Sequence, residues 1–191
     1  MLIENEFAVE QPIDKVWRFF DDVPKVAACL PGAELTEDLG DEAYEGRVSV
    51  RMGPVALKFG GTAKITSRDD AAKRIVVDAA GADEKGRGQA SMTVTATLAS
   101  AGGVTRVHVT QDLQVSGAAA QYGRGMIADV TSVLMRDFAT NLQNGIDRAE
   151  RGEEVTGAAP ARGFSIGLQA TLMALRRVFR RFFAPYPSTS V

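Results

Sequence analysis

The residues that could do polar chemistry are few. The chain of 191 residues has one cysteine, Cys29, and one histidine, His108. A single thiol excludes an internal disulfide and a multi-thiolate metal site, and a single imidazole excludes a histidine cluster. Cys29 lies in an apolar stretch with no base beside it, which favours an inert buried thiol. His108 falls on the outward side of a predicted strand, which favours a solvated imidazole. We expect no metal site and no catalytic residue.

Two glycine pairs carry the spacing of a phosphate-binding loop only superficially. Neither Gly86-Arg87-Gly88 nor Gly123-Arg124-Gly125 completes a Walker pattern or a GxGxxG within a βαβ unit, so nucleotide binding is rejected. The second pair lies in the first turns of a predicted long helix, where each glycine costs up to about 1 kcal/mol relative to alanine. That weak turn either opens to admit a ligand or packs closely on a neighbour, and the sequence leaves both open.

The elements that must position these residues follow from hydrophobic periodicity. Residues 2–10 alternate as a half-buried strand, Pro12 begins the first of two short helices, and the second helix ends before Pro31-Gly32. Period-two patterning then continues to Val115 with five turn signals, which predicts six more strands. Residues 118–149 show helical spacing over about 48 Å. The sequence predicts an antiparallel sheet covered on one side by a long helix.

Small residues on the inward side of the predicted sheet indicate a cavity. Gly46, Gly61, Ala63 and Ala96 cannot fill the space under a helix as leucine or phenylalanine would, although the sheet could instead lie closer to the helix there. We therefore expect that phenylalanine at Gly61 or Ala96 fills the cavity at little cost to folding. Two inward tyrosine hydroxyls could orient a ligand carbonyl or could bond only within the fold. The predicted lining is Phe7, Tyr44, Phe59, Gly61, Met92, Val94, Tyr122, Met126, Val130 and Val133.

Charge separates the body of the chain from its end. Residues 1–150 carry 16 basic and 22 acidic groups, whereas residues 151–191 carry 6 basic and 2 acidic groups. Residues 151–163 read as a flexible linker, residues 164–183 as a cationic amphipathic helix and residues 184–191 as a disordered tail. Such a helix suits the surface of an anionic membrane, and docking on protein is the alternative. The predicted membrane-binding residues are Leu168, Leu172, Leu175, Arg176, Arg177, Phe179, Arg180, Arg181, Phe182 and Phe183.

Several motifs resemble the CoxG family, the G subunit of carbon monoxide dehydrogenase, over about residues 1–150. They are Cys29-Leu30-Pro31-Gly32, Gly53-Pro54, residues 48–61 (VSVRMGPVALKFGG) and the helical run of residues 122–142. The resemblance implies an α+β helix-grip fold of the Bet v1/START-like (SRPBCC) superfamily, in which a seven-stranded curved sheet wraps a long C-terminal helix around a hydrophobic cavity. It also implies an accessory protein of a molybdenum carbon monoxide dehydrogenase, linking that enzyme to the membrane and to respiratory quinone.

The expected function is a non-enzymatic carrier of a hydrophobic ligand, menaquinone, ubiquinone or another lipid, with no covalent cofactor. A helix-grip enzyme of the cyclase or hydrolase type and a docking adaptor with a filled core are the alternatives. The net charge of −2 argues against nucleic-acid binding. An acidic N-terminus without an apolar segment argues against a signal peptide, so we expect a cytoplasmic protein held peripherally at the inner face of the cell membrane.

Overall fold

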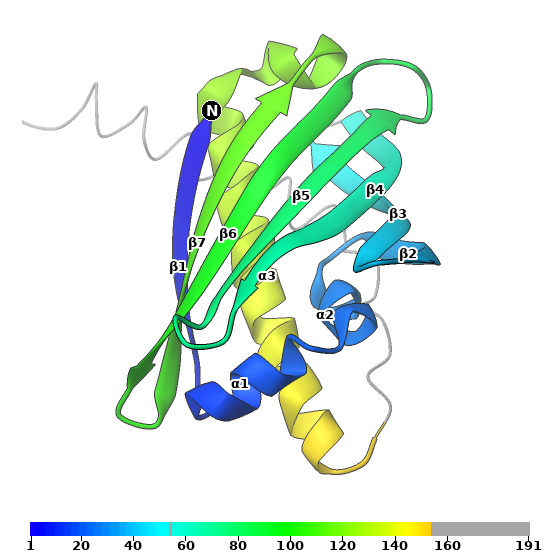
Figure 1. Ribbon diagram of the computed structural model, residues 1–191. Helices are drawn as coiled ribbons and strands as arrows, with labels where there is room; N and C mark the ends of the chain where they lie inside the picture. The colour runs from blue at the N-terminus through cyan, green and yellow to red at the C-terminus, as the bar shows by residue number, and fades with distance from the viewer. Residues whose placement is uncertain (54, 154–191) are drawn as a thin grey trace, which may run out of the picture.

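The computed structural model describes residues 1–53 and 55–153, which form one curved sheet and the helices that line its concave side (Figure 1). The elements in chain order are β1 (Leu2–Val9), α1 (Ile13–Phe19), α2 (Val23–Cys29), β2 (Ala33–Gly40), β3 (Ala43–Met52), β4 (Val55–Asp69), β5 (Arg74–Asp83), β6 (Gln89–Ala101), β7 (Val104–Val115), the 3₁₀ helix η1 (Gly117–Tyr122) and α3 (Gly123–Glu150).

The sheet has the strand order β1-β7-β6-β5-β4-β3-β2, and every neighbouring pair is antiparallel. Consecutive strands from β2 to β7 are joined by tight turns, whereas α1 and α2 carry the chain from β1 at one edge to β2 at the other. The predicted seven-stranded antiparallel sheet and the two short helices after the first strand are confirmed.

The two short helices close one end of the sheet. Pro12 precedes α1 with φ −60°, a value that suits a helix start, and Val16, Trp17 and Phe19 are buried. In α2 the carboxylate of Asp22 accepts a hydrogen bond from the backbone N–H of Lys25 at 3.2 Å. That bond satisfies one of the free N–H groups at the helix start, so each short helix is fixed by local chemistry and by its buried side chains.

The predicted helix over residues 118–149 is not continuous. A 3₁₀ helix ends at Tyr122 and α3 begins at Gly123, which has φ +72°. This left-handed backbone is strained for any residue with a side chain, so glycine marks the junction. From there α3 runs across the concave face of the sheet to the end that α1 and α2 close (Figure 1).

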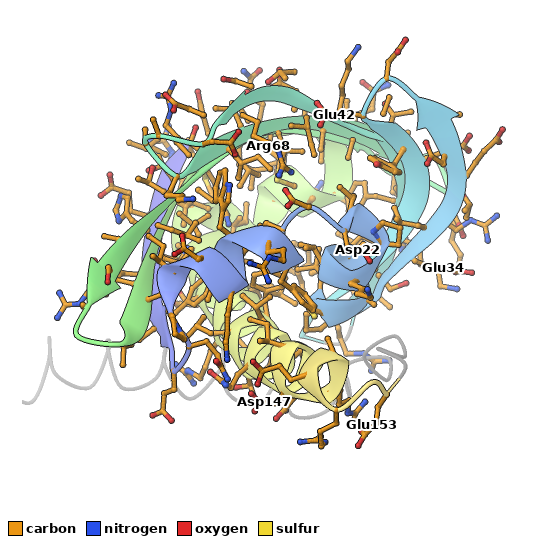
Figure 2. All side chains as sticks on the ribbon, turned by 60° about the horizontal axis from the view of Figure 1, so that its bottom comes forward. Asp22, Glu34, Glu42, Arg68, Asp147 and Glu153 are labelled. Atoms are coloured by element: carbon orange, nitrogen blue, oxygen red, sulfur yellow. The ribbon has the colours of Figure 1, made fainter. Side chains whose placement is uncertain are left out.

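A β-bulge turns Arg68 toward the core. The pairing of β4 with β5 shifts between Ile65 and Ser67, which places Arg68 opposite the buried Ile75. The Arg68 guanidinium lies 5.6 Å from the Trp17 ring centroid and its Nη2 donates to the Phe20 carbonyl at 3.0 Å. Figure 2 shows Arg68 and Asp22 on the side of the sheet that the helices cover. The bulge therefore ties β4 to α1.

The remaining predicted segments lie outside the described residues. These are the linker of residues 151–163, apart from its first three residues, the amphipathic helix of residues 164–183 with all its predicted membrane-binding side chains, and the tail of residues 184–191.

Candidate functional site

The buried hydrophobic side chains form two separate clusters under the sheet. The first lies where α1, α2 and the second half of α3 meet the sheet and includes Trp17, Leu98 and Phe138. The second lies around η1 and the start of α3 and includes Leu57, Ile127 and Val130. The inward residues between them belong to neither cluster.

These intervening residues form two rows across the strands, which we call the central strip. Strand register aligns Met92, Ala79, Ala63 and Tyr44 in one row and Ala90, Gly81, Gly61 and Gly46 in the next. All eight residues are half-buried, whereas Ile65, Ile75 and Leu98 nearer to α1 are buried. Solvent therefore reaches the inward face of β3–β6 at the central strip.

The structure distributes the ten predicted lining residues over three places. Phe59, Tyr122, Met126 and Val130 belong to the cluster around η1. Phe7 and Val94 pack against the first cluster, and Val133 is fully buried. Tyr44, Gly61 and Met92 lie in the central strip. That all ten line one volume remains a prediction.

The expectation that phenylalanine is tolerated at Gly61 is wrong. A Cβ atom at Gly61 would lie 2.0 Å from the carbonyl oxygen of Ala80 and 2.5 Å from the Cα of Gly81, both backbone atoms of the neighbouring strand. Gly61 is therefore required by the close approach of β4 and β5, and a larger residue must push the strands apart.

Phenylalanine at Ala96 is also not expected to be tolerated. Ala96 is 7% exposed and belongs to the cluster that contains Ile75 and Val109. An added ring there overpacks a filled core, which typically costs about 1–3 kcal/mol.

Asp137 is a half-buried carboxyl on α3 that the sequence pattern did not single out. Residues 130, 133, 134, 137 and 141 share one face of the helix by their spacing of three and four. Burial raises the pKa of Asp137 above its usual range, and the charge of Arg136 offsets this in part. The apolar periodicity of α3 carried the signal, since it places residue 137 on the same face as Val130 and Val133.

Tyr44 places a hydroxyl at the edge of the central strip. Burial is the main cause that raises its pKa, and the carboxylates of Asp38 and Glu42 add to the effect. The charge of Arg68 acts in the opposite direction. Tyr44 therefore faces the charged groups around the β2–β3 turn and the bulge of β4.

A groove of about 510 Å³ lies between β1 and α3. Its walls come from residues 5–10 of β1 and the following turn, and from residues 132–144 of α3, with Phe7 and Met135 among the apolar side chains. The Asn5 amide nitrogen is buried without a hydrogen-bond partner among the described residues. Of the ten predicted lining residues, only Phe7 borders this groove.

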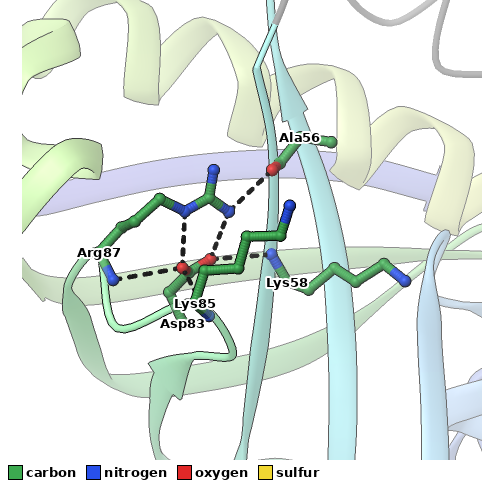
Figure 3. A network of polar contacts seen from close by, with 5 residues as sticks. All are labelled: Ala56, Lys58, Asp83, Lys85 and Arg87. Carbon is green, nitrogen blue, oxygen red and sulfur yellow. Dashed lines mark hydrogen bonds and ion pairs between the residues drawn. The ribbon is translucent and has the colours of Figure 1, made fainter.

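Arg87, from the first glycine pair, serves the fold at the far end of the sheet (Figure 3). Its Nε and Nη2 donate to the Asp83 carboxylate at 2.7 and 2.8 Å, and Nη2 also donates to the Ala56 carbonyl at 3.0 Å. Asp83 also accepts from the backbone N–H groups of Lys58, Lys85 and Arg87. The bonds to Arg87 hold the pKa of Asp83 well below its usual range. With its charged groups already paired, this turn is a structural lock between β4 and the β5–β6 hairpin.

The remaining reactive groups fit structural roles. Cys29 is buried, its thiol donates to the Lys25 carbonyl at 3.2 Å, and burial raises its pKa to about 11. A thiol with so high a pKa is a poor nucleophile at neutral pH. His108 is exposed on the outward side of β7. Within residues 1–53 and 55–153, no group of three His, Cys, Asp or Glu side chains is placed to hold a metal ion.

None of the helices in the described part of the chain is both long and apolar enough to cross a bilayer.

Solved structures similar to this one share its fold at low sequence identity. A conserved protein from Geobacillus kaustophilus is 20% identical with a TM-score of 0.69, covering 78% of this chain and 97% of its own. A protein from Thermus thermophilus is 14% identical with a TM-score of 0.57, covering 78% of this chain and 99% of its own. The Zhui aromatase/cyclase from Streptomyces sp. R1128 is 15% identical with a TM-score of 0.50, covering 83% and 99%. The fold is the predicted helix-grip fold of the Bet v1 type.

A sequence comparison decides the family where the structures show only the fold. No curated protein matches the chain. The family model of the carbon monoxide dehydrogenase G subunit (CoxG) matches residues 6–147, which is more than half of the 191 residues. The chain therefore belongs to the CoxG family of carbon monoxide dehydrogenase.

Proposed function

We propose that the chain is a non-enzymatic carrier that holds an isoprenoid quinone, menaquinone or ubiquinone, or a similar lipid on the concave face of its sheet. The central strip carries this proposal. It offers half-buried small side chains between two filled cores, opposite an amphipathic helix, so an apolar molecule that settles there removes apolar surface from water.

The partner follows from the family. The family name ties it to carbon monoxide dehydrogenase, so we propose that the chain serves such a molybdenum enzyme as an accessory protein. The basic amphipathic segment of residues 164–183 supports peripheral attachment to the anionic inner face of the cell membrane. The carrier would then move a lipophilic electron acceptor between the membrane and the enzyme.

An enzyme of the same fold is the second candidate, and Asp137 is the observation that favours it. A half-buried carboxyl with a raised pKa is a group that acid–base chemistry can use. Against it, the Asp137 carboxyl has no hydrogen bond or ion pair to any described residue, so nothing on this part of the chain orients it as an acid or a base.

Analysis of the bound lipid separates these functions. The full chain is purified from its own cells without detergent, extracted with organic solvent and analysed by mass spectrometry. A carrier yields an unmodified quinone or lipid in about equimolar amount and returns it unchanged after incubation. An enzyme converts an added ligand to a product, and an adaptor with a filled core binds the dehydrogenase but yields no lipid.

A further inference from the structure

We infer that Asp137 is the polar contact for the ligand head group and that it makes the chain bind the hydroquinone form more tightly than the quinone. The inference rests on the proposed carrier function, because it names the redox form of the ligand that the same site prefers. It starts from one unmatched carboxyl in an otherwise apolar part of the concave side.

The position of Asp137 along α3 matches the level of the central strip. Val130, two turns earlier, belongs to the cluster around η1. Asn141, one turn later, donates from Nδ2 to the Cys29 carbonyl at the end of α2 at 3.0 Å. Asp137 shares their helix face and lies between these two contacts.

The helix neighbours of Asp137 leave its carboxyl unmatched. Val133 and Leu134, one turn before it, are apolar. One turn after it, Thr140 donates to the Arg136 carbonyl at 3.1 Å and the amide of Asn141 is directed to Cys29. Among residues 1–53 and 55–153, no side chain or backbone group makes a hydrogen bond or ion pair with the Asp137 carboxyl.

The strand side supplies no donor either. The half-buried residues of the central strip are alanine, glycine and methionine apart from Tyr44. The charged groups that shift the pKa of Tyr44 are Asp38, Glu42, Arg68 and Asp22, and Asp137 is not one of them. Asp137 therefore faces a surface that is short of hydrogen-bond donors, which agrees with the rise of its pKa by burial.

A ligand can supply the missing donor. Asp137 is only half-buried, and pKa shifts of about three units or more occur at fully buried groups, so it is ionised at pH 7.5. A carboxylate only accepts hydrogen bonds. The two hydroxyls of a hydroquinone donate to it, whereas the two carbonyls of a quinone only accept and are repelled. A hydrogen bond to an ionised acceptor is roughly twice as strong as a neutral one, so the redox form decides the contact.

The test compares both redox forms on the full-length protein. The probes are a naphthoquinone and a dimethoxybenzoquinone, each with a tail of two isoprene units, titrated in oxidised and chemically reduced form by anaerobic equilibrium dialysis at pH 7.5. We expect at least one pair to bind with a hydroquinone Kd about tenfold lower than the quinone Kd, a difference of about 1.4 kcal/mol.

Variants assign this preference to Asp137. Asp137→Asn keeps the shape, and its amide both donates and accepts, so the ratio of the two Kd values should fall to within about twofold. The matched control is Glu4→Gln, which removes an exposed carboxylate on the outward side of β1 and should leave the ratio unchanged.

Each remaining outcome has one meaning. Equal binding of the two forms, or tighter binding of the quinone, to the wild-type protein overturns the inference but leaves the carrier function standing, and this arm needs no variant to fold. An unchanged ratio in Asp137→Asn removes Asp137 from the explanation. Absence of binding by every probe contradicts the proposed quinone carrier, and the inference fails with it.

Discussion

Replacing Gly61 by alanine tests the close approach of β4 and β5 that shapes the central strip. The new methyl group would lie 2.0 Å from the Ala80 carbonyl oxygen and 2.5 Å from the Gly81 Cα, where real Cβ atoms are essentially never found. The obstructing atoms belong to backbone, so the strands must move and the paired residues of both strands move with them. Forcing extra volume into such a site costs about 1–3 kcal/mol.

Thermal and urea unfolding measure this cost. For a domain of this size about 2 kcal/mol corresponds to a fall in Tm of about 4–8 °C. Gly60→Ala is the matched control on the preceding residue, since its added Cβ meets no atom within 4 Å, and its Tm should change by about 2 °C or less. Equal Tm values for the two variants would refute the argument that backbone contact requires glycine at position 61.

Three further predictions concern other parts of the molecule. Asp83→Asn lowers stability at neutral pH, because the pKa of the folded-state Asp83 carboxyl lies well below its ordinary value and the ionised form is the stabilising one; the stability difference from wild type, followed by urea unfolding, should be constant above about pH 5 and shrink below about pH 4 as the carboxyl of the unfolded chain becomes protonated. Cys29 should react with a thiol reagent only slowly in the native protein and rapidly in denaturant, and fast reaction in the native state would contradict its burial and its pKa of about 11. The full chain should sediment with anionic liposomes, less so as salt rises, and the fourfold arginine-to-glutamine variant should lose its preference for anionic over neutral lipid while retaining some adsorption; absence of binding at low salt would reassign the segment to protein docking. The four arginines are Arg176, Arg177, Arg180 and Arg181.

Alternation and turn signals were enough to predict the strands, because each inward side chain of this one-sided sheet must be apolar or small. Periodicity did not reveal the bulge in β4. Strict alternation places Arg68 outward, whereas one extra residue after Ile65 turns it toward Trp17. A register shift depends on the partner strand and leaves no mark in the pattern of a single strand.

The site was predicted less completely than the fold. Gly61 was correctly placed on the inward face, but its role in strand approach depends on the backbone of β5, which the local sequence does not encode. Gly123 was recognised as a weak point, yet the helix breaks there into a 3₁₀ segment because its φ is +72°. Asp137 lay within a clear apolar helical pattern and was passed over because carboxylates on helices usually face water.

The central claim, that an apolar ligand occupies the central strip, is tested most directly by native mass spectrometry of the full chain from its own cells, compared with Ala79→Leu. Ala79 is half-buried in the row that joins Met92 to Tyr44, so the longer side chain should enter the strip without overpacking a core. We predict that the wild-type mass includes one quinone or lipid per chain and that the variant keeps its Tm within about 2 °C while losing most of this ligand. A ligand-free wild-type protein, or equal occupancy in a folded Ala79→Leu variant, would contradict the account.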